Sequence, residues 1–362
     1  MLNPEALAAA STLRARFHGA LLGLAIGDAV AAATQFRRAG SFTPIGDMLG
    51  GGPFDLPRGG WSDDTAMALC LADSLLERDG FDARDQVERY RRWQQEGYLT
   101  ATGQCVGITA SSARAIAMAQ WRRQAFSGSH DPTQLDPEPL SRVAPVVLFF
   151  FSNHAHSIEQ ATEAARTTCQ APAVLEACRS LAQALHAALS GQPKSVVLAH
   201  ATLAAAAVGG ATLNTGTSGA GTPGSARREA ADAGVSAKTA LPAAVGLARP
   251  GVNPRASANP RAPHAAPGTS ASEVRDGTTA PAALASAVAA FGATDNFRDA
   301  VLYSANLGGD SDVIAAVCGQ LAGAYYGVKA IPTSWHNGLM RKELITSYAD
   351  RLLAHAMLGM AG

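Results

Sequence analysis

Four aspartates stand out because they occur in two close pairs, each beside an apolar stretch. Asp63 and Asp64 lie in "WSDDT", and Asp310 and Asp312 lie in "GGDSDV". One interpretation is structural: acids near the start of a helix are stabilised by the helix dipole, and Ser62 is of a type that often occupies the N-cap. Each pair taken alone fits this interpretation.

The two pairs taken together favour a metal site. If the helices that follow them pack side by side, four carboxylates converge. Four buried anions without partners would cost more than the stability of a whole domain, about 5–15 kcal/mol. Oxygen ligands, with the hydroxyl of Ser62 or Thr65 added, suit Mg²⁺, Mn²⁺ or Ca²⁺ rather than zinc. We expect two such ions, although the spacing along the chain leaves open whether the pairs meet.

The sequence around the aspartates predicts helices. Residues 12–33 place Leu13, Phe17, Leu21 and Leu24 on one face and then become apolar on all sides, as expected for a helix that enters a core. Few runs show the two-residue alternation of strands, so we predict an all-α fold. Further helices are predicted over residues 62–78, 82–98, 171–191, 280–294, 296–309 and 340–358.

Composition narrows the classes of function. The 362 residues include 29 basic and 29 acidic side chains, so no overall field attracts nucleic acid or an anionic membrane. The most apolar early stretch, residues 19–36, is interrupted by Asp28 and is too short to span a bilayer. Five cysteines without a CxxC pair indicate reduced thiols in a cytoplasmic protein.

One segment differs from the rest. Residues 209–270 contain no aromatic side chain and are rich in Ala, Gly, Pro, Ser and Thr. They bury too little apolar area to offset an ordering entropy of about 1–2 kcal/mol per residue. We predict a disordered insertion at about 209–270 within a single domain of residues 1–362. The alternative is a partner-binding loop on a helical scaffold.

Three stretches resemble the ADP-ribosylglycohydrolase family, which includes the dinitrogenase-reductase-activating glycohydrolases. They are "GALLGLAIGDAVAAATQF", "GGGPFDLPRGGWSDDTAMALCLADSL" and "NLGGDSDVIAAVCGQLAGAYYG", and the resemblance extends over about 13–208 and 275–340. It implies a compact, orthogonal all-α bundle and an N-glycosyl hydrolase with two Mg²⁺ or Mn²⁺ ions. The substrate implied is an ADP-ribosylated protein or small molecule, with ADP-ribosylarginine as the linkage.

The resemblance also implies residue roles. Asp63 or Asp64 would act as the catalytic base, as in glycoside hydrolysis generally. Backbone N–H groups of the 103–107 loop would bind the diphosphate, although a short glycine loop also fits a plain connection between helices. The implied metal ligands are Ser62, Asp63, Asp64, Asp310 and Asp312, and the implied substrate-binding residues are Gly103, Cys105, Gly107, Gly308 and Gly309.

Several positions depart from the family pattern, and three of them are single residues at the implied site. Val313 stands where a threonine hydroxyl usually helps to bind metal, Gln35 where many members have glutamate, and Cys169 where a histidine is common. Each change removes a polar group from the implied site. A degenerate, weakly active or non-catalytic ADP-ribose-binding homologue is therefore the alternative to an active enzyme.

Overall fold

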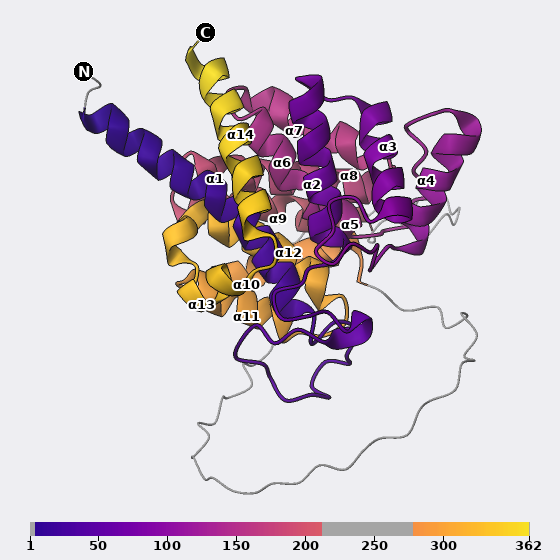
Figure 1. Ribbon diagram of the computed structural model, residues 1–362, viewed down its shortest axis with the longest axis horizontal. Coiled ribbons are helices and arrows are strands. Elements are labelled where there is room, and N and C mark those ends of the chain that lie inside the picture. The colour runs from indigo at the N-terminus through magenta and orange to yellow at the C-terminus, as the bar shows by residue number, and fades with distance from the viewer. Residues whose placement is uncertain (1–3, 212–277, 362) are drawn as a thin grey trace, which may run out of the picture. The chain divides into compact units, whose positions relative to one another are not determined.

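The computed structural model describes residues 4–211 and 278–361. Within these ranges the chain forms helices, with no strand and two isolated β-bridges (Figure 1). The all-α prediction is confirmed, and every helix predicted from the sequence is present. The helices are α1 Pro4–Ala31, α2 Asp63–Arg78, α3 Ala83–Glu96, α4 Ala110–Arg122, α5 Glu138–Ser141, α6 Val143–Phe149, α7 His154–Ala165, α8 Pro172–Leu189, α9 Lys194–Ala211, α10 Ala280–Gly292, α11 Phe297–Ala305, α12 Ser311–Tyr326, α13 Thr333–Gly338 and α14 Lys342–Ala361, with 3₁₀ turns at Gly52–Phe54 and Val328–Ala330.

The central pair of helices is α1 and α12, which run antiparallel with their backbones in contact. A Cβ atom built on Gly23 would lie 2.2 Å from the carbonyl oxygen of Gly319, and one built on Gly19 would lie 2.1 Å from that of Gly323. The same holds one turn further, where Gly27 faces the carbonyl oxygen of Ala315 at 2.0 Å. Small residues at intervals of four on both helices therefore allow this close approach.

The antiparallel pairing brings the carboxyl end of α1 to the amino end of α12. The segment after α1 pairs with the loop before α12: Phe36 N–H donates to the Gly309 carbonyl (2.7 Å), and Gly309 N–H donates to the Arg37 carbonyl (2.8 Å). Gly308 has a φ of +73°, and a Cβ there would lie 2.4 Å from the Arg37 carbonyl oxygen. Glycine is therefore required at this turn.

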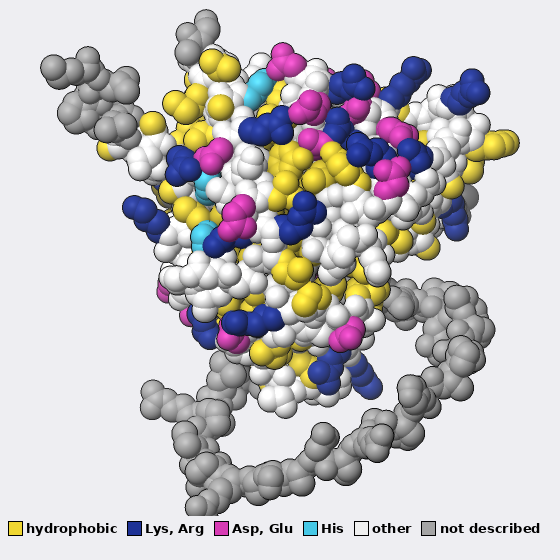
Figure 2. All heavy atoms as spheres, in the orientation of Figure 1, with side chains coloured by type: hydrophobic (Ala, Val, Ile, Leu, Met, Phe, Trp, Pro, Cys, Tyr) yellow, Lys and Arg dark blue, Asp and Glu magenta, His cyan; other side chains and the backbone are white. Residues whose placement is uncertain are grey.

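The surface carries side chains of both charges (Figure 2), as expected from the equal numbers of basic and acidic residues. On the face drawn in Figure 2, basic and acidic side chains are interspersed. Within the described ranges no helix combines the length and apolarity needed to cross a membrane. The predicted insertion at about 209–270 falls outside the described residues after Ala211, where α9 ends, so its disorder and the single-domain organisation stay predictions.

Candidate metal centre

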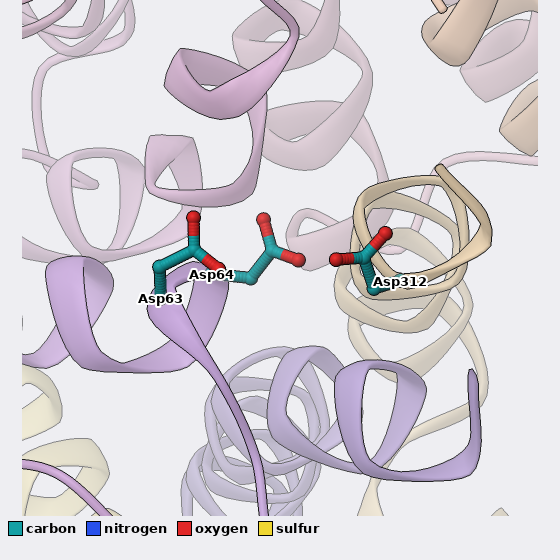
Figure 3. A group of neighbouring side chains, drawn as sticks. All are labelled: Asp63, Asp64 and Asp312. Carbon is teal, nitrogen blue, oxygen red and sulfur yellow. The ribbon is translucent and has the colours of Figure 1, made fainter. Parts of the chain in front are cut away.

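Three of the four aspartates converge. Asp63 and Asp64 lie in the first turn of α2, and Asp312 lies in the first turn of α12. One carboxylate oxygen from each lies within 4.8 Å of the others, and the three residues are 5%, 2% and 7% exposed. The Asp64 carboxyl lies between the other two and points toward Asp312 (Figure 3). The structure therefore brings together two groups that are far apart in the sequence.

The cluster contains buried oxygens with no hydrogen-bond donor. Asp64 Oδ2 and Asp312 Oδ1 are buried, and neither accepts a hydrogen bond. Buried polar atoms in folded proteins are almost always paired, so two unpaired oxygens in one cluster require an explanation. A hard divalent cation fits, because carboxylate oxygens are the ligands that such ions prefer. The donor set present is therefore suited to Mg²⁺ or Mn²⁺.

Burial and mutual repulsion make the negative charges of the three carboxylates unfavourable when no cation is bound. Burial, followed by the charge of Asp312, raises the pKa of both Asp63 and Asp64 well above the usual range. Burial, followed by the charge of Asp28, raises the pKa of Asp312 to about 8. Without a cation the cluster therefore favours protonated carboxyls, and metal binding requires that these protons leave.

Asp28, from α1, contacts the start of α2. Its Oδ1 accepts from the Ser62 N–H (3.0 Å) and hydroxyl (2.8 Å), and its Oδ2 accepts from the Thr65 N–H (3.1 Å) and hydroxyl (2.7 Å). Ser62 occupies the N-cap position, but its hydroxyl makes no capping bond to α2. The N-cap interpretation of Ser62 was therefore incomplete, because the capping oxygens belong to Asp28.

The residues just after α1 contact the start of α12. Gln35, which is buried, donates from its side-chain amide to Asp312 Oδ2, and the hydroxyls of Thr34 and Ser311 lie 3.1 Å apart. The amide at position 35 thus holds one oxygen of Asp312 and leaves the other without a donor. Val313 is buried beside Asp312 and offers only methyl groups.

Asp310 lies apart from the group of three. It occupies the N-cap position of α12, and its Oδ2 accepts the Thr278 N–H at 2.6 Å. Among the described residues the convergent group contains Asp63, Asp64 and Asp312 and does not include Asp310. The prediction that Asp310 and Ser62 are metal ligands is not tested by this geometry.

The 103–107 loop touches the cluster at one end. Gly107 has a φ of +84°, and a Cβ there would lie 2.0 Å from Asp63 Oδ1, so any other residue would be strained and would displace the Asp63 carboxylate. Burial and then the charge of Asp63 raise the pKa of the half-buried Cys105 to about 11. The Gly103 N–H already donates to Thr100 Oγ1 (2.8 Å), and the Gly309 N–H to Arg37. These two N–H groups are engaged within the protein, and substrate binding by Gly103, Cys105, Gly107, Gly308 and Gly309 stays a prediction.

A buried ion pair behind the cluster was missed from the sequence. Arg142 Nε donates to Glu138 Oε1 at 2.6 Å, with both side chains almost fully buried. The charge of Glu138 contributes to the raised pKa of Asp63, and a hydrogen bond from Ser141 partly offsets that of Asp64. The i, i+4 spacing of Glu138 and Arg142 was the available signal. Cys169 lies at the edge of this region, where its thiol donates to the Gln134 carbonyl (3.4 Å).

Comparison with known proteins connects this geometry to a family. The ADP-ribosylglycohydrolase family model matches residues 9–360. The ADP-ribosylarginine hydrolase Tri1 of Pseudomonas putida (strain GB-1) is 30% identical over 343 residues, which cover 94% of this chain and 78% of that protein. The ADP-ribosyl-dinitrogen reductase glycohydrolase of Rhodospirillum rubrum is 24% identical, covering 95% and 96% of the two chains. A solved structure titled ADP-ribosylglycohydrolase-related protein complex has 32% identity and a TM-score of 0.69, covering 96% of this chain and all of that one.

Proposed function

Since this chain belongs to the ADP-ribosylglycohydrolase family, we propose that it hydrolyses the bond between ADP-ribose and a modified arginine side chain. The matched family and the named relatives are ADP-ribosyl hydrolases, so this chain is an enzyme of that class. Arginine is proposed as the acceptor because two relatives, from Pseudomonas putida and Serratia proteamaculans (strain 568), are named ADP-ribosylarginine hydrolases. An ADP-ribosylated protein is the proposed substrate.

The convergence of Asp63, Asp64 and Asp312 is the observation that carries this proposal. These residues would hold a first Mg²⁺ or Mn²⁺ ion, because two of their buried oxygens have no other partner. We propose a second ion with Asp310 and Ser62 among its ligands. When bound, the ions supply Lewis-acid polarisation and lower the pKa of a nearby water.

The protein's own groups would then position the substrate and accept a proton. Asp63 or Asp64 is the proposed general base, because a carboxylate at the site can take the proton from the attacking water as positive charge develops on the ribose. The tight contact of Gly107 with Asp63 would place the 103–107 loop beside the reacting ribose, where free backbone N–H groups can bind the diphosphate.

The test is release of ADP-ribose from an ADP-ribosylarginine peptide by the full chain with Mg²⁺ or Mn²⁺. Asp312→Ala is expected to abolish turnover. Asp310→Ala is expected to lower the number of bound Mn²⁺ ions from two to one. Asp299→Ala, at a half-exposed aspartate of α11, is the matched control and is expected to retain wild-type activity.

Folded wild-type protein that releases no ADP-ribose from any linkage would refute the hydrolase proposal. Binding of ADP-ribose without turnover would instead identify the chain as a non-catalytic homologue. In that case Val313 is the first position to test, because a threonine there restores a hydroxyl to the first turn of α12.

A further inference from the structure

We propose that Asp28 is a positioning residue for the metal centre: it caps α2 from a neighbouring helix and thereby fixes where Asp63 and Asp64 point. This inference rests on the proposed function, because it concerns the same cluster. It assigns a role to a buried acid that contacts Ser62 and Thr65 and lies outside the convergent group. Asp28 is 1% exposed and lies near the end of α1.

The first step is the hydrogen bonding of Asp28. Its two oxygens accept from two backbone N–H groups and two hydroxyls, all belonging to Ser62 and Thr65. The N–H groups of a first turn have no partner within the helix, and usually the N-cap side chain provides one. Here that side chain makes no such bond. Asp28 therefore replaces the local cap.

The second step is the position of the anchors. Ser62 and Thr65 lie immediately before and after Asp63 and Asp64 in the chain. Holding both to one carboxylate fixes the rotation of the turn between them. Since four donors occupy the Asp28 oxygens, we infer that Asp28 orients ligands and is not itself a ligand. Such outer residues commonly tune metal affinity.

The third step is the register of α1 itself. Gly27, the residue before Asp28, lies against the Ala315 carbonyl of α12, so Asp28 cannot move independently of that helix. Gln35, seven residues later, donates to Asp312. The end of α1 and the turn that follows it therefore contact both halves of the cluster, and we infer that they set the separation between the α2 and α12 carboxylates.

The experiment compares Mn²⁺ binding by Asp28→Asn and by wild type, using the full chain and the electron paramagnetic resonance signal of free Mn²⁺. Asparagine keeps the size but replaces one acceptor oxygen with a donor that faces other donors. We expect the Mn²⁺ dissociation constant to rise about 10- to 100-fold, the range seen for outer-shell changes. Melting temperature is measured alongside.

The matched control is Asp73→Asn. Asp73 is also a buried aspartate of α2, and it accepts from the hydroxyls of Tyr98 and Tyr348 (2.9 Å for the latter). Its replacement is expected to lower the melting temperature while changing the Mn²⁺ dissociation constant by less than about two-fold, as for a distant independent site.

A wild-type dissociation constant in Asp28→Asn, or an equal loss of affinity in Asp73→Asn, would overturn the inference. Absence of Mn²⁺ binding in the wild-type chain would overturn the proposed metal centre as well, so the two failures are distinguishable. If Asp28→Asn does not fold, Thr65→Val and Thr65→Ser make the same test. Affinity should fall in the valine variant, which lacks a hydroxyl, and recover in the serine variant.

Discussion

Replacing Gly23 with alanine tests whether the contact between α1 and α12 positions the metal centre. The new Cβ would lie 2.2 Å from the Gly319 carbonyl oxygen, so the two backbones must separate by at least about 1 Å to reach a normal contact. Overpacking of this kind costs about 1–3 kcal/mol. The better helix propensity of alanine returns at most about 1 kcal/mol.

We expect Gly23→Ala to lower the free energy of unfolding by up to about 2 kcal/mol, which is the overpacking cost less the full return from helix propensity. Urea denaturation followed by circular dichroism measures it. Because α1 carries Asp28 and α12 carries Asp312, Mn²⁺ affinity should fall in the same variant. Gly292→Ala is the control: it lies at the exposed end of α10, where a Cβ would be 3.5 Å from the nearest side-chain atom.

Gly292→Ala should leave stability unchanged or raise it by up to about 1 kcal/mol, with unchanged Mn²⁺ affinity. If Gly23→Ala behaved like this control, the close backbone contact would not determine the register of the two helices. The argument that α1 connects the two halves of the site would then fail.

Three further predictions concern the cluster itself. First, the free energy of unfolding of the metal-free protein should fall as pH rises from about 4 to 8. The reason is that Asp312 has a pKa of about 8 in the folded state, whereas an unfolded aspartate titrates near 3.9. Urea melts at pH 5 and pH 8 should show this fall with EDTA present and not with Mn²⁺ present. Second, Gly107→Ala should abolish ADP-ribose release, because its Cβ would overlap Asp63. Gly103 also has a positive φ but has open space around it, so Gly103→Ala should only lower the free energy of unfolding, by about 1–2 kcal/mol in urea melts. Equal activity in the two variants would contradict the overlap argument. Third, Gln35→Glu should lower the melting temperature of the metal-free protein, because it adds a carboxylate beside Asp312. The same variant should bind Mn²⁺ more tightly, as measured by titration. A higher melting temperature in EDTA would be inconsistent with the clustered charge.

The sequence was informative where a pattern is local. The apolar periodicity of residues 12–33 predicted α1, and the acids of "WSDDT" and "GGDSDV" predicted the starts of α2 and α12. The sequence left open whether Asp63 and Asp312 meet. It indicated only that a cation would be needed if they do, because buried anions need compensation. The resemblance to the family added that the three motifs occur along this chain in the same order as in the family.

The remaining features depend on contacts between distant segments. No local pattern shows that the Asp28 oxygens cap α2, because a cap is expected from the residue next to the helix. The separation of Asp310 from the cluster reflects its bond to Thr278, which precedes α10.

The pairing of the first long helix with a late one also determines when the enzyme can become active during its synthesis. α12 begins about 280 residues after α1 ends. At about 5–20 residues per second, a ribosome needs roughly 15 to 55 s to make the intervening chain. Throughout that interval the apolar surface of α1 that α12 will cover has no permanent neighbour, and no shorter translation product contains both halves of the reaction centre. The metal centre can therefore assemble only after α12 has been made.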